Sequence, residues 1–430
     1  MNGRPFLLLL PAIFACARSP RASTPESMAS PMAAGMKQEP AIPGVSDRAM
    51  RLYREALVID THNDLPTQII DEKYNPDIRH PAGSRAPDEG HTDIPRLVES
   101  GIDAVFLSAF IDAPYALGTN RSYQRTLVYL DTIDALVKRH PNTLMRATSA
   151  ADLQRARAAG KVAVFTGVEG GHAIENSLER LRELHRRGTR YMTLTWNNGN
   201  EWAGSNAGTN GTSKGGLTPF GREVIAEMNR LGILVDISHV SDSTFFDAVA
   251  ASTMPVIASH SSSRAINLHR RNMTDDMLRA VARNGGVVNV NFAAQFIDSV
   301  YRLSTENVDR SVASLQDSLR RAGSDAETVR REGAARRSAM MMSVAPARFS
   351  VLIDHFDHIA KVAGVDHVGI GSDFDGVGAL PDGMDDVTRL PLIAQALLDR
   401  GYSERDVRKV LGGNMLRVME RAIDRAPGNR

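Results

Sequence analysis

Short apolar runs alternate with longer amphipathic segments from about residue 46 onward. Eight of these runs lack the polar alternation of a half-exposed sheet, which is typical of strands buried on both faces. They cover residues 57–61, 104–108, 162–166, 191–195, 233–237, 256–259, 287–291 and 368–371. The segments between them have helical spacing, as in Leu178, Leu181 and Leu184. Strands that alternate with helices predict parallel pairing, and eight strands are what a closed (β/α)8 barrel requires.

Polar residues with catalytic potential follow several of these runs. An open, doubly wound α/β sheet is the structural alternative, and it would gather such residues at one switch point. Here His62 and Asp64 follow the first run, Glu169 the third, His239 the fifth, His260 the sixth and Asp373 the eighth. Because barrel enzymes collect their active sites from the carboxyl ends of many strands, this distribution favours an α/β barrel of the metal-dependent hydrolase kind.

One stretch interrupts the alternation. Residues 298–345 are charged and contain three arginine pairs followed by three consecutive methionines. They predict a helical insertion after the seventh strand of a domain that spans residues 46–425. A solvated helical pair packed on the barrel is favoured over a substrate lid.

Composition excludes some classes of partner. The chain has 430 residues, of which 42% are hydrophobic, so it can bury a large core. Its 51 basic and 50 acidic residues nearly cancel. Because no Lys/Arg stripe with interleaved aromatics is present, nucleic-acid binding is not expected.

The N-terminus predicts export. Arg4 precedes an apolar stretch over residues 6–15 that is too short to span a bilayer and is typical of a secretory signal, so residues 1–17 are interpreted as a signal segment. The single cysteine, Cys16, ends a sequence that resembles a bacterial lipoprotein box. Ordinary cleavage after Ala17 is the alternative.

Residues 18–45 are rich in Ala, Ser, Pro and Met and predict a disordered linker. We expect the exported protein in the bacterial cell envelope or periplasm, where lipidated Cys16 would tether it to a membrane. Without lipidation, the protein would be periplasmic or secreted. A body without cysteine has no disulfides.

Five side chains together have the composition of a metal site. His62 and Asp64 are two residues apart in an extended segment, so they point the same way and can offer a nitrogen and an oxygen to one ion. His239 and His260 suit a second ion, and Glu169 has two oxygens with which to bridge both. Each residue alone would more often be structural, but the set predicts a dimetal centre. Mixed nitrogen and carboxylate ligation favours zinc, with manganese or cobalt as substitutes.

Asp373 is expected at the same rim. Two metal ions would lower the pKa of a bridging water, and a neighbouring carboxylate could pass its proton to a leaving amine. The alternative is that Asp373 organises the turn at Gly376. Either Arg270 or Arg271, if it points inward, could grip a substrate carboxylate through two parallel hydrogen bonds.

The other histidines are weaker candidates. His172 is expected to hydrogen-bond rather than to bind a metal. His355 and His358 lie on a charged helical face and are interpreted as solvated surface. His367 begins the last strand at its non-catalytic end.

Several ordered motifs resemble the membrane (renal) dipeptidase family of zinc peptidases, peptidase family M19. The resemblance runs from about residue 50 to residue 422. The matching pieces are residues 59–64 (Ile-Asp-Thr-His-Asn-Asp), 169–171 (Glu-Gly-Gly), 236–241 (Asp-Ile-Ser-His-Val-Ser), 259–262 (Ser-His-Ser-Ser), 270–272 (Arg-Arg-Asn), 371–376 (Gly-Ser-Asp-Phe-Asp-Gly) and 413–418 (Gly-Asn-Met-Leu-Arg-Val).

This resemblance implies a metallo-dipeptidase with two zinc ions per chain, which cleaves dipeptides through a hydroxide activated by both metals. It implies that His62 and Asp64 bind one ion, that His239 and His260 bind the other, and that Glu169 bridges them. It also implies that Asp373 handles the proton and that Arg271 binds the substrate's carboxylate. Enzymes of this family often tolerate a D-residue at the second position, and some open β-lactams or cleave dehydropeptides.

The sequence departs from the family at two positions. In the renal branch a histidine that contacts the substrate carbonyl follows Thr-Leu-Thr, whereas Trp196 stands at that position here. An indole N–H can donate but cannot carry charge. Trp196 is thus a substrate-contacting residue without the histidine's chemistry. Ala293 stands where the family has an aromatic residue, which predicts a reshaped pocket.

Two other functions stay open on the sequence alone. Another amidohydrolase-type enzyme, such as a lactonase or a deaminase, could use the same metals, although a lactone without a carboxylate has no use for Arg271. A catalytically inactive, surface-anchored binding protein is the other alternative, and the complete set of ligand candidates argues against it. The predicted partners are a dipeptide and the membrane, and a homodimer is left open.

Overall fold

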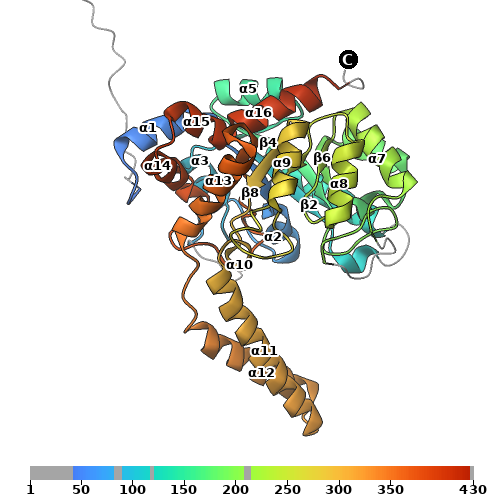
Figure 1. Ribbon diagram of the computed structural model, residues 1–430, viewed down its shortest axis with the longest axis vertical. Coiled ribbons are helices and arrows are strands. Elements are labelled where there is room, and N and C mark those ends of the chain that lie inside the picture. Colours follow the sequence, from blue (N-terminus) through green and yellow to red (C-terminus); the bar gives the residue numbers. More distant parts are fainter. Residues whose placement is uncertain (1–41, 82–89, 117–120, 208–214, 427–430) are drawn as a thin grey trace, which may run out of the picture. The chain divides into compact units, whose positions relative to one another are not determined.

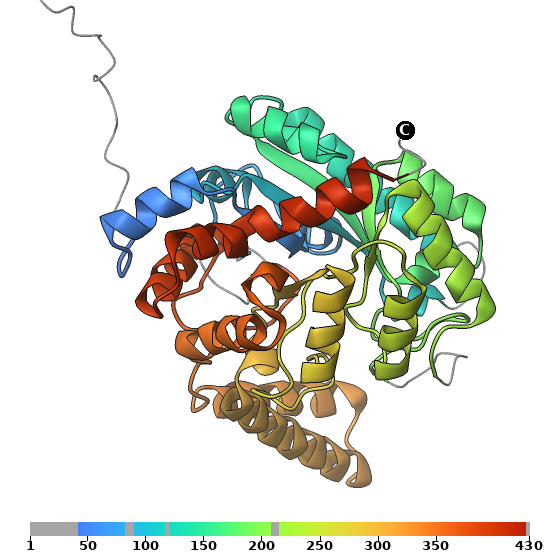
Figure 2. The same ribbon diagram turned by 45° about the horizontal axis from the view of Figure 1, so that its top comes forward.

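The computed structural model describes residues 42–81, 90–116, 121–207 and 215–426. The strands are β1 (Ile59–Asn63), β2 (Ala104–Phe110), β3 (Leu144–Arg146), β4 (Val162–Glu169), β5 (Thr189–Thr193), β6 (Leu234–Asp236), β7 (Ile257–Ala258), β8 (Val287–Val290) and β9 (Val368–Ile370). They pair in parallel in the order β2-β1-β9-β8-β7-β6-β5-β4-β3, and a pairing of β2 with β4 closes a ring of eight strands. Helices surround this ring, which is a (β/α)8 barrel (Figures 1 and 2).

Each of the eight predicted runs contributes one strand to the barrel, so the predicted fold is confirmed. The short strand β3 was not predicted, because three residues are too few to show a period. It pairs with the first half of β4, whereas β5 pairs with the second half of that strand. The strand β3 therefore lies beside the ring and is not one of its eight members.

The α-helices lie between the strands and at both ends of the chain. They are α1 (Asp47–Glu55), α2 (Leu65–Asp71), α3 (Ile94–Glu99), α4 (Arg121–Arg139), α5 (Ala150–Ala158), α6 (Leu178–Arg186), α7 (Pro219–Leu231), α8 (Asp242–Ala251), α9 (Asp275–Asn284), α10 (Ala294–Ile297), α11 (Ser299–Arg321), α12 (Ala326–Met341), α13 (Phe349–Ala363), α14 (Pro391–Asp399), α15 (Glu404–Arg408) and α16 (Asn414–Met419). Among the described residues, no helix combines the length and the apolar character needed to span a bilayer.

Local sequence explains where the helices begin and end. The side chain of Thr218 caps α7 by accepting a hydrogen bond from the Gly221 N–H, and Pro219 occupies the first turn. The same helix ends at Gly232, whose φ of 77° is the left-handed conformation that glycine adopts without strain. The helix α9 ends in the same way at Gly285, with a φ of 84°.

Aromatic side chains of neighbouring strands pack together in the buried core. The ring of Phe106 lies 4.7 Å from that of Phe165 and 5.6 Å from that of Tyr191. Gly167 leaves the space that the Tyr191 ring occupies, because a Cβ there would lie 1.9 Å from a ring atom. This packing fixes the Tyr191 hydroxyl 2.7 Å from Nδ1 of His62. The barrel core therefore helps to orient one of the predicted ligands.

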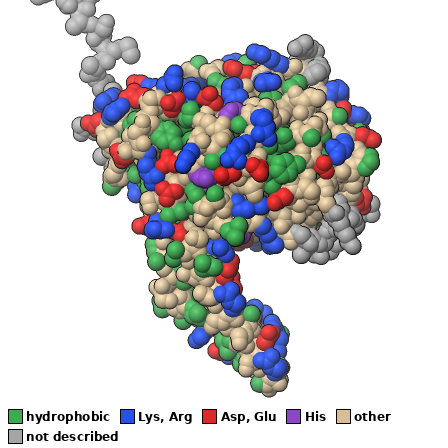
Figure 3. All heavy atoms as spheres, viewed as in Figure 1, with side chains coloured by type: hydrophobic (Ala, Val, Ile, Leu, Met, Phe, Trp, Pro, Cys, Tyr) green, Lys and Arg blue, Asp and Glu red, His purple; other side chains and the backbone are tan. Residues whose placement is uncertain are grey.

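Residues 298–345, predicted as a helical insertion, contain α11 and α12. Figure 1 shows the two helices side by side, extending away from the barrel. Only Tyr301, Val308, Val329 and Gly333 of these two helices are buried. Figure 3 shows many charged side chains on the visible face of this hairpin. The hairpin is therefore held to the barrel mainly at its base.

The interpretation of His355 as a solvated surface residue is wrong. Its side chain is fully buried. Its Nδ1 accepts a hydrogen bond from the Ser263 N–H at 2.9 Å, and its Nε2 lies 3.0 Å from the Ile297 carbonyl oxygen. The helical pattern showed charged neighbours, but it could not show that α13 packs this residue against Ser263 and the end of α10.

Candidate metal centre and active site

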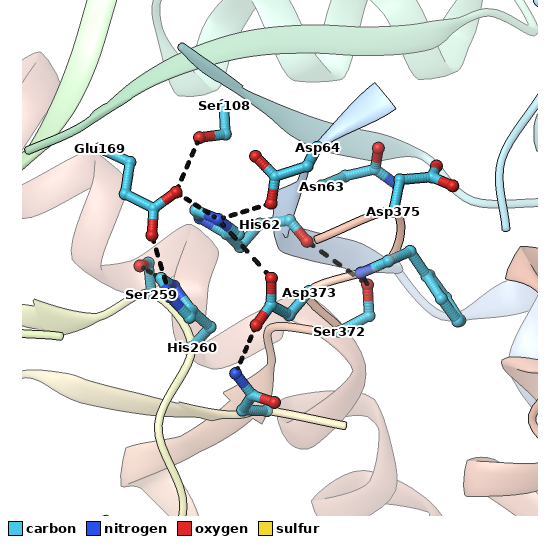
Figure 4. Close-up of polar contacts among 12 residues, drawn as sticks. His62, Asn63, Asp64, Ser108, Glu169, Ser259, His260, Ser372, Asp373 and Asp375 are labelled. Carbon is cyan, nitrogen blue, oxygen red and sulfur yellow. Dashed lines mark hydrogen bonds and ion pairs between the residues drawn. The ribbon is translucent and has the colours of Figure 1, made fainter. Parts of the chain in front are cut away.

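The predicted site residues come together at the carboxyl ends of the barrel strands. His62 and Asp64 lie at the end of β1, Glu169 ends β4, and His260 and Asp373 follow β7 and β9. Figure 4 shows their side chains converging on one point. Donor atoms of His62, Glu169 and His260 lie close enough to hold one ion, as do donor atoms of His62, Asp64 and Asp373.

The two carboxylate oxygens of Glu169 face different histidines. Its Oε2 lies 3.3 Å from Nε2 of His62, on the side where Asp64 Oδ2 is 3.2 Å from the same nitrogen. Its Oε1 lies 3.0 Å from Nε2 of His239 and 3.5 Å from Nε2 of His260. The carboxylate therefore stands between the two halves of the cluster, as a bridging ligand would.

Several donor atoms of the cluster have no satisfactory protein partner. Nε2 of His62 and Oδ1 of Asp64 are buried without a hydrogen-bond partner among the described residues. Nε2 of His239 lies only 2.9 Å from Nε2 of His260. Burial lowers the pKa of His239 to about 4 and that of His260 well below its usual range, so both imidazoles are neutral at pH 7. Such converging lone pairs fit a divalent metal ion.

Each histidine of the cluster is held at its other ring nitrogen. Besides the contact of His62 with Tyr191, Nδ1 of His239 lies 3.2 Å from Oδ1 of Asn197. Nδ1 of His260 lies 2.8 Å from the Ser259 hydroxyl (Figure 4). A partner on Nδ1 selects the tautomer whose Nε2 lone pair is free for a metal.

Two buried aspartates organise the strand ends beneath the histidines. Asp236 accepts hydrogen bonds from the Ser259 hydroxyl at 2.6 Å and from the Ser259 N–H at 2.8 Å. Asp60 accepts from the Ser372 N–H at 2.8 Å and from the Ser372 hydroxyl. Burial raises the pKa of Asp60 to about 6. The sequence motifs contained both aspartates, but nothing in them showed which serine each one holds.

Asp373 lies beside the cluster with one oxygen engaged. Its Oδ2 accepts a hydrogen bond from Nδ2 of Asn291 at 2.7 Å, whereas its Oδ1 is 3.9 Å from Nε2 of His62. Burial raises the pKa of this carboxyl above its usual range. Gly376 permits the close approach, because a Cβ there would lie 2.2 Å from Asp64 Oδ2 and 2.4 Å from Asp373 Oδ1.

Arg271 is buried next to the same cavity. Its Nη2 donates to the His260 carbonyl oxygen at 3.1 Å, and its guanidinium lies 5.5 Å from the centre of the Phe296 ring. Its Nε and Nη1 are buried without a partner among the described residues. A guanidinium with two unused donors is suited to a carboxylate.

A cavity of about 270 Å³ opens above the cluster. Its wall contains Asp64, Glu169, Trp196, His239, Arg271 and Asp373, all of which the sequence singled out, together with Thr67, Phe110, Asn197, Gln295, Phe296 and residues 375–378. The ring of Trp196 packs edge-on against Phe110 at 4.9 Å. His172 does not line this cavity; its Nε2 lies 3.0 Å from the Ile111 carbonyl oxygen.

Sequence reasoning missed a second pair beside the site. Oδ1 of Asp375 accepts from the His91 N–H at 2.6 Å, and the Asp375 N–H donates to Nδ1 of His91 at 2.8 Å. This reciprocal pair fixes the loop after Asp373. The only sequence signal was the Asp375-Gly376 turn, because His91 is distant in the chain and lies outside every apolar run.

Comparisons with known proteins agree with this geometry. The model of the membrane dipeptidase family, peptidase family M19, matches residues 46–428. The fold is similar to that of the probable dipeptidase PvdM from Pseudomonas aeruginosa, with a TM-score of 0.76 and 23% identity over 88% of this chain and 98% of that chain.

Two further solved structures share 27% identity with this chain. One is the metallopeptidase dipeptidase AC, with a TM-score of 0.65 over 86% of this chain and 99% of that chain. The other is a metallopeptidase from Rhodobacter sphaeroides liganded with a phosphinate mimic of the dipeptide L-Ala-D-Ala, with a TM-score of 0.64 over 85% of this chain and 99% of that chain.

Proposed function

Because this chain belongs to the membrane dipeptidase family and is therefore a metallo-dipeptidase, we propose that it hydrolyses dipeptides with two bound zinc ions. His62 and Asp64 would hold one ion, His239 and His260 the other, and Glu169 both. The observation that carries this assignment is the position of the Glu169 carboxylate, whose two oxygens face the two pairs separately.

Side chains of the protein would carry out the proton transfer and shape the pocket. When bound, the zinc ions supply Lewis acidity, which polarises the scissile carbonyl and lowers the pKa of water. Asp373 takes the proton of the attacking water and passes it to the leaving amine, because its free oxygen points at the cluster while Asn291 holds the other. Trp196 forms a wall of the pocket at the position of the family's histidine.

The size of the cavity and the unused donors of Arg271 support a small substrate with a free carboxylate. At about 270 Å³ the cavity lies just below the range of ~300–1,000 Å³ for small-molecule sites, which suits a dipeptide better than a longer chain. Arg271 would bind the substrate's carboxylate through its unused donors. Acceptance of a D-residue at the second position is proposed from the L-Ala-D-Ala mimic bound by the Rhodobacter relative.

The deciding experiment assays the purified protein, with and without a chelator, against L,L and L,D dipeptides, tripeptides and lactones. We expect chelator-sensitive cleavage confined to dipeptides and restored by zinc. Activity only on lactones, or none after zinc is restored, would overturn the proposal. Metal analysis of the active protein should find two zinc ions per chain.

Replacing Tyr191 with phenylalanine should weaken metal binding. The variant keeps the packing against Phe106 but removes the oxygen that lies 2.7 Å from Nδ1 of His62. Loss of such a supporting contact typically lowers metal affinity by about 10- to 100-fold. Zinc competition with a chromophoric chelator measures this loss. The matched control is Tyr53→Phe, at a buried tyrosine whose hydroxyl has no hydrogen-bond partner among the described residues. An unchanged zinc affinity would remove Tyr191 from the metal support.

Replacing Arg271 with methionine should abolish the preference for a free C-terminal carboxylate. Hydrogen bonds to charged groups contribute about 1.5–3 kcal/mol, so wild type should cleave a dipeptide on the order of 10- to 100-fold more efficiently than its amide. The variant should cleave both at the same low rate, measured as kcat/KM. Arg270→Met, at a residue whose Nη1 donates to the Ala207 carbonyl oxygen, is the control. A preference that survives in Arg271→Met would assign the carboxylate to another group.

We also propose that the protein is exported and tethered through lipidated Cys16. Residues 1–41 lie outside the described part of the chain, so this proposal rests on the sequence. Cys16→Ser should move the protein from the membrane fraction to the soluble fraction of the cell envelope. Continued membrane association of the variant would contradict lipidation at this residue.

A further inference from the structure

A second, smaller cavity lies between the α11–α12 hairpin and the barrel. Its volume is about 130 Å³, room for on the order of four water molecules at ~30 Å³ each. Tyr301, Thr305 and Asp309 of α11 line it, with Arg337 and Met341 of α12. Because these residues recur every four positions, they form one face of each helix. We call this space the hairpin compartment.

The hairpin compartment adjoins the catalytic cavity. Gln295, Val377 and Gly378 line both spaces, so the two spaces share these residues as a common wall. The Ala294 N–H donates to the Ala379 carbonyl oxygen at 3.0 Å and ties the two segments of this wall together. A ligand bound in the catalytic cavity therefore lies beside this shared wall of the hairpin compartment.

The base of the hairpin is fixed to the barrel at several points. Asp298 caps α11 through the Val300 N–H at 2.9 Å and also accepts from Nε of Arg348, beyond the end of α12, at 3.2 Å. Nε of Arg302 donates to Oδ1 of Asn267 at 2.9 Å. The same asparagine donates to the Gln295 carbonyl oxygen at 2.9 Å. These bonds fix the start of α11, and with it the α11 residues that line the compartment, relative to the barrel.

The compartment lies on the side where the substrate's carboxylate would bind. Gln295 precedes Phe296, and the guanidinium of Arg271 lies over the Phe296 ring. Arg271 and Gln295 line the same catalytic cavity, so we place the side chain of the C-terminal residue of a dipeptide held by Arg271 beside Gln295. Ala293 also lines the compartment, and its single methyl group leaves space that an aromatic side chain would fill.

We propose that the hairpin compartment is a specificity subsite for the side chain of the C-terminal residue, an inference that rests on the proposed dipeptidase function. Asp309 and Arg337 form an ion pair between the two helices, with 55% and 50% of their side chains exposed. The pair offers acceptors and donors without net charge. It fits a long side chain that ends in a carboxamide, because that group donates and accepts at once.

The test compares dipeptides of alanine followed by alanine, glutamine, methionine or glutamate, in L,L and L,D forms, on the zinc-loaded enzyme. Wild type should show the highest kcat/KM for the glutamine dipeptide. Thr305→Trp fills the compartment and should lower that value about tenfold or more, while cleavage of alanyl-alanine stays within about twofold. Leu303→Trp is the matched control, since Leu303 is an exposed residue of α11 outside the compartment.

The outcomes separate this inference from the proposed function. Equal effects of Thr305→Trp on the glutamine and alanine dipeptides, or no effect on either, would overturn the subsite while leaving the dipeptidase intact. A wild-type preference for the methionine or glutamate dipeptide would overturn the carboxamide assignment. Failure of wild type to cleave any dipeptide would instead contradict the proposed function.

Discussion

Asp373→Asn should retain both metal ions but lose nearly all turnover. An amide cannot accept the proton of the attacking water or return it to the leaving amine, and general acid–base catalysis contributes about 10²- to 10⁴-fold. We therefore expect kcat to fall about a thousandfold. The measurement pairs steady-state kinetics with metal analysis of the same preparation.

The geometry explains why the metals should stay. Oδ1 of Asp373 is 3.9 Å from Nε2 of His62, farther than the nearest oxygens of Asp64 and Glu169. Asparagine is isosteric with aspartate, and its carbonyl oxygen can still accept from Asn291. The polar contact that orients the side chain is thus preserved while its proton chemistry is removed.

A surface variant provides the control for Asp373→Asn. Asp385→Asn changes an exposed aspartate in the same strand-to-helix connection and should leave both kcat and zinc content unchanged. If Asp373→Asn lost zinc instead, Asp373 would be a ligand, as its place in the group with His62 and Asp64 permits. If it kept normal turnover, another group would have to carry the proton.

Glu169→Gln should have the second large effect, on metal content and activity together. The amide is uncharged and has one oxygen acceptor and one NH₂ donor, so both halves of the cluster lose the carboxylate's charge and one half also loses its oxygen ligand. We expect zinc content to fall from two to one or fewer per chain, with kcat/KM lower by on the order of 10⁴-fold, since the chemistry depends on the paired metals. Elemental analysis and dipeptide hydrolysis measure the two losses.

The folded state should survive the Glu169→Gln change. In the metal-free protein the buried Glu169 carboxylate faces the imidazoles of His62, His239 and His260 and accepts from the Ser108 hydroxyl. Glutamine breaks this buried pairing, so the metal-free variant should stay folded at the assay temperature but unfold at a lower temperature than metal-free wild type. Glu72→Gln, at an exposed position at the end of α2, should change neither property. Two zinc ions retained by Glu169→Gln would show that Glu169 does not bridge them.

The sequence by itself was enough to predict the barrel and which side chains meet at its rim. Apolar runs and helical spacing are local properties, and the period of each run is enough to predict a buried strand or an amphipathic helix. Parallel strands then place their carboxyl ends at one rim. For this reason, His62, Glu169, His260 and Asp373 could be expected together, although hundreds of residues separate the first from the last.

Only the tertiary structure decided which groups support that site and what surrounds it. The contacts of Tyr191 with His62, and of Asn197 with His239, join residues from different strands or from the connections that follow them, so no spacing along the chain could show them. Burial of His355 and the placement of the α11–α12 hairpin beside Gln295 likewise depend on how distant elements pack. The period of a helix shows which face it buries but not which element packs against that face. The residues that line the pocket depend on this packing.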